Sequence, residues 1–104
     1  AVHAALETLG NYKTSKRRLI AALGDMRELG SDGISLHQSL YEHILSNKID
    51  KVFTVGDLMH HLFVKIPESI KGVHTNSSEE MASKILEYLE PGDVILIKGS
   101  LSMK

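Results

Sequence analysis

Glycines and charged residues follow two strongly apolar runs of the chain, and their types suit the binding of an anionic ligand. Gly24 and Asp25 follow the run 19–23, and Lys98, Gly99 and Ser100 follow the run 94–97. Glycine lets a ligand approach the backbone closely. A lysine ammonium beside free backbone N–H groups suits a carboxylate or a phosphate. We therefore expect a ligand to bind where these two runs end.

A third pair, Gly56 and Asp57, follows the run 52–55. A Gly-Asp pair after a strand is also the ordinary sequence of a turn followed by a helix cap. That structural interpretation is favoured for Gly56 and Asp57, and Asp57 is then expected to cap the helix that follows. Composition alone leaves both interpretations open for the two other bends.

The apolar runs before these bends predict strands buried on both faces, separated by helices. We expect strands over 19–23, 52–55, 73–75 and 94–97, and helices over 1–9, 35–45, 57–63 and 77–89. Such alternation is typical of an α/β domain with three layers, in which helices cover both faces of a mostly parallel sheet. Ligands of such sheets bind outside the carboxyl ends of the strands.

Local signals refine these elements. Residues 24–35 carry three glycines and are expected to form a long loop, and the basic segment 13–18 is expected to be solvated. The pairs Ser35/Gln38 and Ser77/Glu80 have the spacing of a capping box. The residues expected to face inward are Leu36, Leu40, Ile44 and Leu45 in one helix, and Met81, Ile85, Leu86 and Leu89 in another.

Composition excludes several classes of function. The 104 residues carry 12 Lys and Arg against 13 Asp and Glu, and this net charge of −1 argues against binding nucleic acid or an anionic membrane by bulk charge. The absence of cysteine excludes disulfides, thiolate metal sites and cysteine nucleophiles. No apolar run is long enough to insert into a membrane, and no signal pattern opens the chain, so we expect a cytoplasmic location.

Several catalytic and binding motifs are also missing. No glycine is followed by lysine, so no P-loop is present, and neither G-x-G-x-x-G nor G-x-S-x-G occurs. His60 and His61 are neighbours on a predicted helix and point about 100° apart, so they do not form an i, i+4 metal pair, and no metal site is expected. His37 is expected either to touch a ligand or to hold the preceding loop.

Two longer motifs resemble a known family. Residues 23–30, LGDMRELG, closely resemble the LGDMxELG segment of the Mur ligases, and His37 falls at the family's Leu-His pair. Residues 91–100, PGDVILIKGS, are similar to the family's PGDVVLVKGSR, although Leu101 stands where the family usually has arginine. Residues 52–56 and 4–6 also match in order. The resemblance therefore covers nearly the whole chain.

The resemblance implies that residues 1–104 are the Rossmann-like C-terminal domain of a three-domain cytoplasmic ligase. The resembled branch adds D-alanyl-D-alanine to UDP-N-acetylmuramoyl-tripeptide in peptidoglycan synthesis. In that family ATP phosphorylates the tripeptide carboxylate, and the dipeptide amine attacks the acyl phosphate. ATP and Mg²⁺ are then held mainly by the other domains, and the isolated chain is expected to be inactive.

The resemblance also implies site residues, none of which is assigned as catalytic. Gly24, Asp25, Met26, Glu28, Gly30 and His37 would face the nucleotide and the closing domains, whereas Lys98, Gly99 and Ser100 would bind the dipeptide. Asp25→Ala and Lys98→Ala are each expected to lower turnover in the intact enzyme with little loss of folding stability. For one ligand site to include both sets of residues, the bends near residues 24 and 99 must lie on one rim of the sheet and face a shared cleft.

Two alternatives remain at this point. One is a non-catalytic α/β binding or regulatory module that keeps the ligase fold, which Leu101 allows. The other is a phosphoacceptor receiver, which fits poorly because it needs two acidic residues after the first strand and only Asp25 is present.

Overall fold

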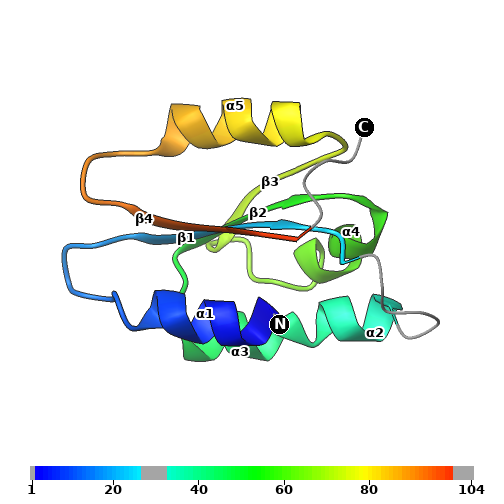
Figure 1. Ribbon diagram of the computed structural model, residues 1–104, viewed down its shortest axis with the longest axis horizontal. Helices are drawn as coiled ribbons and strands as arrows, with labels where there is room; N and C mark the ends of the chain where they lie inside the picture. The colour runs from blue at the N-terminus through cyan, green and yellow to red at the C-terminus, as the bar shows by residue number, and fades with distance from the viewer. Residues whose placement is uncertain (1, 27–32, 100–104) are drawn as a thin grey trace.

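The computed structural model describes residues 2–26 and 33–99, and its strands form one parallel sheet (Figure 1). The strands are β1 (Leu19–Gly24), β2 (Lys51–Val55), β3 (Lys71–Thr75) and β4 (Val94–Lys98). Their order across the sheet is β3-β2-β1-β4. The predicted parallel α/β sheet is confirmed, and the strand predicted over 73–75 begins two residues earlier.

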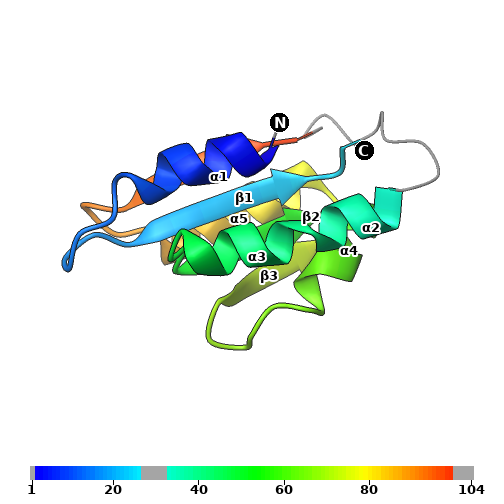
Figure 2. The same cartoon turned by 90° about the horizontal axis from the view of Figure 1, so that it is seen from below.

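Helices cover both faces of this sheet and complete the predicted three layers. They are α1 (Val2–Gly10), α2 (Gly33–Gln38), α3 (Leu40–Ser46), α4 (Asp57–Phe63) and α5 (Ser78–Tyr88). α5 lies on one face, and α1, α2 and α3 lie on the other (Figures 1 and 2). No helix within residues 2–26 and 33–99 combines the length and the apolar character that a membrane span requires.

The central strand β1 is buried along its whole length because it faces a core on each side. Leu19, Ala21 and Leu23 pack in the core shared with α1, α3 and α4. Ile20 and Ala22 pack in the smaller core under α5. Successive strand side chains point to opposite faces. A strand covered on both faces therefore has to be apolar without alternation, as this one is.

The single helix expected over 35–45 is wrong, because two short helices occupy this region. α2 already begins at Gly33, so Ser35 lies inside it and does not cap it. The helices are divided at Ser39, whose hydroxyl donates to the Leu36 carbonyl at 2.6 Å. Serine competes with the helical backbone for such bonds, and this explains why the periodic pattern alone misjudged the boundary.

Part of the inward-facing set was also wrong. Leu40, Ile44, Met81 and Ile85 are buried, Leu89 is partly buried, and Leu36, Leu45 and Leu86 are exposed. Leu86 is 74% exposed because it lies one helical step from Ile85, and α5 buries only a narrow stripe. The capping residue of this helix is confirmed, since the Ser77 hydroxyl accepts the Glu80 N–H at 3.1 Å.

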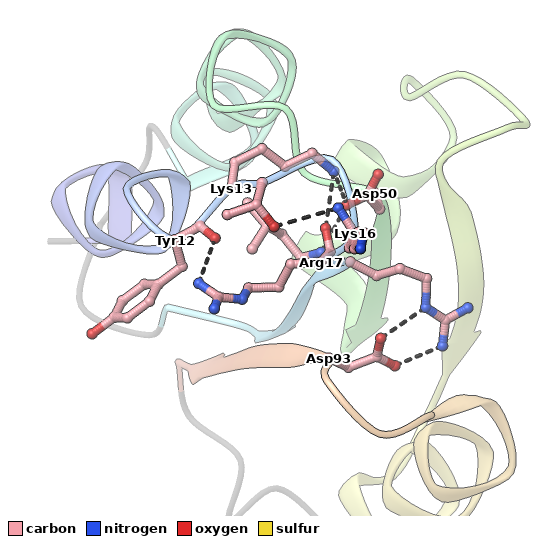
Figure 3. Close-up of polar contacts among 9 residues, drawn as sticks. Tyr12, Lys13, Lys16, Arg17, Asp50 and Asp93 are labelled. Atoms are coloured by element: carbon pink, nitrogen blue, oxygen red, sulfur yellow. Dashed lines mark hydrogen bonds and ion pairs between the residues drawn. The ribbon is translucent and has the colours of Figure 1, made fainter.

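Ion pairs join distant segments at the amino-end edge of the sheet (Figure 3). The Lys13 ammonium lies 2.6 Å from the Asp50 carboxylate, which also accepts the Leu19 N–H at 2.7 Å. Arg18 donates two bonds to Asp93, at 2.8 and 2.6 Å. The expectation that segment 13–18 is merely solvated is therefore wrong for these basic side chains, because each meets a carboxylate from another turn.

The Arg18–Asp93 pair is reinforced by its surroundings. The guanidinium carbon lies 4.2 Å from the centre of the Tyr88 ring, and a guanidinium nitrogen donates to the Tyr88 carbonyl at 2.9 Å. Hydrogen bonding from Arg18 lowers the pKa of Asp93 below its ordinary value of 3.8. The pair links the start of β1 to the turn before β4, so it fixes two strands that are far apart in the sequence.

The lowered pKa predicts an acid-dependent loss of stability. A carboxyl whose pKa is lower in the folded state stabilises the fold above its unfolded pKa, and that contribution is lost as the pH falls below about 3.8. Asp93→Asn should therefore lower the melting temperature by several degrees at pH 7, and by much less at pH 3. Glu90→Gln is the control, because Glu90 is 70% exposed and 3.9 Å from Arg18. Thermal unfolding at both pH values tests this, and equal losses at both would contradict it.

Candidate functional site at the carboxyl edge of the sheet

The order of the strands creates a switch point between β1 and β4. The chain adds β2 and β3 on one side of β1 and then returns to place β4 on the other side. Ligands of open α/β sheets bind at such a switch point, outside the carboxyl ends of the strands. Leu23 pairs with Lys98 across these two parallel strands. The bends near residues 24 and 99 therefore leave the sheet side by side, which confirms the predicted common rim.

Gly99 is required where these bends meet. Its φ of +106° is rarely adopted by residues with a side chain, and a Cβ at this position would overlap the Gly24 carbonyl. The backbone after β4 therefore lies directly against the backbone that ends β1. This contact explains why the KGS motif has a glycine at this position, because any larger residue would push the two bends apart.

The Asp25 side chain caps α4. It is 8% exposed, and its carboxylate accepts the Met59 N–H at 2.8 Å and the Leu58 N–H at 3.2 Å. Free N–H groups in the first turn of a helix need such acceptors. A residue at the end of β1 thus caps a helix that begins more than thirty residues later in the chain.

The prediction that Asp57 caps this helix is consequently wrong. Asp57 is the first residue of α4, and Gly56 occupies the capping position without a side chain to accept a bond. Gly56 has a φ of +108°, and a Cβ there would overlap the Asp25 carboxylate. Glycine makes room for a cap supplied by the neighbouring strand. This arrangement also argues against the expectation that Asp25 has little effect on folding.

His37 lies in α2, is fully buried, and bonds to two separate backbone segments. The Met26 N–H donates to Nε2 at 3.0 Å, and Nδ1 lies 2.6 Å from the Gly33 carbonyl oxygen. Of the two roles considered for His37, this geometry supports the one in which it holds the chain after β1. Neither ring nitrogen is left over for a ligand.

Lys98 ends β4 and is exposed. The ion pairs formed among residues 2–26 and 33–99 do not include its ammonium, so it can act as a positive charge on the rim. The predicted site residues Glu28, Gly30 and Ser100, together with Leu101, lie outside the described residues. The structure therefore brings together Gly24, Asp25, Met26, His37, Lys98 and Gly99 at one edge of the sheet.

His74 in β3 was not singled out from the sequence. Its Nδ1 lies 2.7 Å from the buried Thr54 hydroxyl, and its ring centre lies 4.9 Å from that of His60. Burial and then the neighbouring His60 lower the pKa of His74 below its ordinary value of 6.5. His60 therefore pairs with His74 rather than with His61, whose ring is 6.4 Å away. Only the fold brings these two side chains together.

The described residues do not fit a magnesium ion. Within 2–26 and 33–99 there is no group of three or more His, Asp or Glu side chains arranged to hold a metal. Both Asp25 carboxylate oxygens already accept helix N–H groups. This donor set offers backbone caps and a single ammonium, and that combination suits an organic anion better than a cation.

Two grooves lined by described residues were also missed, because their walls come from scattered positions. One, of about 420 Å³, lies beside α5 and is lined by Phe53, Tyr88, Gly72, Val73, Glu87 and the lysines 51, 71 and 84. The other, of about 390 Å³, lies between α1 and β4. Neither includes Asp25 or Lys98, so both are separate from the rim.

The cap supplied by Asp25 predicts a specific loss of stability. Asp25→Ala should lower the free energy of unfolding by about 1–2 kcal/mol, as expected for a lost helix cap. Asp57→Ala, which removes an exposed charge from the first turn of the same helix, should cost less than about 1 kcal/mol. Urea unfolding of both variants tests this, and the reverse order would show that Asp57 is the cap after all.

The environment of His74 predicts a second pH dependence. A histidine whose pKa is lowered in the folded state opposes protonation, so the fold loses stability as the pH falls below about 6.5. His74→Gln should reduce this loss between pH 7 and pH 5. His61→Gln should leave it intact, because His61 is not among the groups that lower the pKa of His74. Melting temperatures measured across this range decide the matter, and an unchanged slope in His74→Gln would rule out this source.

Comparison with known proteins shows the family to which the chain belongs. Residues 1–101 match the model of the family described as "Mur ligase, glutamate ligase domain". The chain is 32% identical to the UDP-N-acetylmuramoyl-tripeptide--D-alanyl-D-alanine ligase of Rickettsia prowazekii (strain Madrid E), over 100% of this chain and 23% of that protein. It is 34% identical to the ligase of the same name from Bacillus subtilis (strain 168), over 94% of this chain and 21% of that protein.

The ligase of that name from Haemophilus influenzae (strain ATCC 51907 / DSM 11121 / KW20 / Rd) is 29% identical over 97% of this chain and 22% of that protein. The chain thus spans about a fifth of the length of the curated relatives it matches. The matched region contains all nine helices and strands found in residues 2–26 and 33–99. On this evidence the chain belongs to the Mur ligase family and corresponds to the family's C-terminal domain.

Proposed function

We propose that this chain is the C-terminal domain of an ATP-dependent ligase that joins D-alanyl-D-alanine to UDP-N-acetylmuramoyl-tripeptide. Such a ligase would act in the cytoplasm, in the peptidoglycan synthesis that bacterial growth and division require. The relatives that match nearly all of the chain carry this activity in their names. The observation that carries the proposal is the pairing of Leu23 with Lys98, because these two residues belong to the two family motifs and lie at the switch point of the sheet.

The rim supplies positioning and charge rather than a nucleophile. Amide formation requires a carboxyl group and an amine to be held in contact, and this alone accounts for much of the catalysis in such reactions. Lys98 offers an exposed ammonium at the end of β4, which suits the free carboxylate of the incoming dipeptide. Gly99, which lacks a side chain, allows the backbone beside this charge to lie directly against Gly24.

Asp25 and His37 have a supporting role in this proposal. Their hydrogen bonds fix the backbone after β1 against α4 and α2, and they have no free polar atoms directed at a substrate. A rigid rim is useful when one domain closes over substrates held by another, because a closed site excludes water from a reactive intermediate. We infer that the domain binds the dipeptide at this rim and closes over the active site.

ATP and Mg²⁺ belong to the remainder of the proposed enzyme. The chain contains no P-loop, and its described residues form no group of metal ligands. The relatives are about five times as long as the matched region, which leaves ample sequence for a nucleotide site. The contribution of this domain is therefore the dipeptide side of the site.

The role of Lys98 can be tested in the full-length protein. Lys98→Ala should raise KM for D-alanyl-D-alanine up to about fivefold, because an exposed pair with a carboxylate contributes at most about 1 kcal/mol. Lys98→Arg should recover most of this loss because it keeps the charge. Lys16→Ala is the matched control, since Lys16 is an exposed lysine in the segment that enters β1 from the amino-end edge.

Steady-state kinetics with the dipeptide varied at saturating ATP and tripeptide measure these values. An unchanged KM in Lys98→Ala would remove the assignment of this residue. A full-length wild-type protein with no ligase activity would instead favour a non-catalytic module that has kept the fold. The two results are distinct, because the first requires an active enzyme.

A further inference from the structure

His37 connects the two described ends of a motif-bearing stretch of chain. Met26 lies two residues after Gly24, and Gly33 begins α2. The imidazole lies between them, with Nε2 3.0 Å from the Met26 nitrogen and Nδ1 2.6 Å from the Gly33 oxygen. Because the ring is fully buried, neither bond has water as a ready substitute. One side chain thus fixes the backbone on both sides of residues 27–32.

The partners of the ring determine where its proton lies. The Met26 N–H can only donate, so Nε2 must present a lone pair, and the Gly33 carbonyl can only accept, so Nδ1 must carry the proton. A neutral imidazole with its proton on Nδ1 satisfies both. The other neutral form and the charged form each place an N–H against the Met26 N–H. The geometry therefore needs one acceptor and one donor at fixed positions, and not merely a residue that fills space.

The same segment is held from a second direction. Asp25 precedes Met26 and binds the first turn of α4, whereas Met26 is bound to α2 through His37. β1 ends at Gly24, so the sheet no longer fixes the backbone at these two residues. Side chains take over that task at the point where the backbone lies next to Gly99. The Met26 N–H is thus held by α2 two residues after Gly24, whose backbone contacts Gly99.

We propose that His37 is a positioning residue for the ligase reaction, acting through the hydrogen bond between its Nε2 and the Met26 backbone. The inference rests on the proposed function and adds to it a residue that touches no substrate. The bond to Met26 positions the backbone that follows β1 at the rim, whereas the bond to Gly33 holds the imidazole ring against α2. The two bonds can be separated, because each uses a different ring nitrogen.

A matched pair of variants separates them in the full-length protein. The amide of His37→Gln reaches the position of Nε2 and can accept the Met26 N–H, but it leaves the Gly33 carbonyl. The amide of His37→Asn reaches the position of Nδ1 and can donate to Gly33, but it leaves Met26 without an acceptor. Each variant loses one buried hydrogen bond, so their melting temperatures should fall by similar amounts.

Their kinetics should differ. His37→Asn should lower kcat about tenfold or more, because displacement of a supporting group by a fraction of an ångström is enough to slow such reactions. The kcat of His37→Gln should be at least about fivefold higher than the kcat of His37→Asn. Ile44→Val is the stability control, since Ile44 is fully buried in α3 and its variant should lower the melting temperature without changing kcat.

The outcomes are distinguishable from failure of the proposed function. Ligase activity in the wild type, with equal kcat values in the two His37 variants, would overturn the positioning role and leave a purely structural histidine. The positioning role would also be overturned if the loss of kcat in all three variants followed the loss of melting temperature. Recovery of kcat in His37→Gln alone establishes that the Met26 bond is the one that matters. Absence of wild-type activity would instead overturn the proposed function.

Discussion

The end of β1 imposes the constraint on which the rest of the site depends. A parallel strand that leaves the sheet loses its ladder partners, and its next backbone groups need others. Here the Asp25 carboxylate turns back to cap α4, and the Met26 N–H is satisfied by His37. These two contacts allow strand β1 to end beside Gly99 while the Asp25 carboxylate and the Met26 N–H both keep hydrogen-bond partners. The rim owes its shape to them.

The two edges of the sheet use charge in opposite ways. At the amino-end edge, Lys13 and Arg18 are matched by Asp50 and Asp93, so the cations hold segments together (Figure 3). At the carboxyl edge the buried carboxylate is matched by helix N–H groups, and the exposed Lys98 belongs to no ion pair formed within residues 2–26 and 33–99. Charge that is internally neutralised stabilises the fold, whereas charge left at a switch point is available to a ligand.

Local signals and global packing account for different parts of the agreement with the sequence predictions. The apolar run of β1 predicted a doubly buried strand, because only coverage of both faces allows such a run. Ser77 predicted its cap, because that bond spans only three residues. The prediction that Asp57 caps α4 was wrong, because the cap comes from Asp25 at the end of another strand. The prediction that segment 13–18 is solvated was also wrong, because the carboxylates that pair with Lys13 and Arg18 are distant in the chain.

The sequence by itself determined the fold class, the strands and the family, because these depend on periodicity, local caps and contiguous motifs. It also marked Gly24 and Lys98 as ends of strands. Only the tertiary structure decided that these ends are neighbours, that Asp25 caps α4, and that His74 meets His60. Such contacts depend on strand order and register, and no spacing along the chain encodes a distance between segments that meet only after the sheet has assembled.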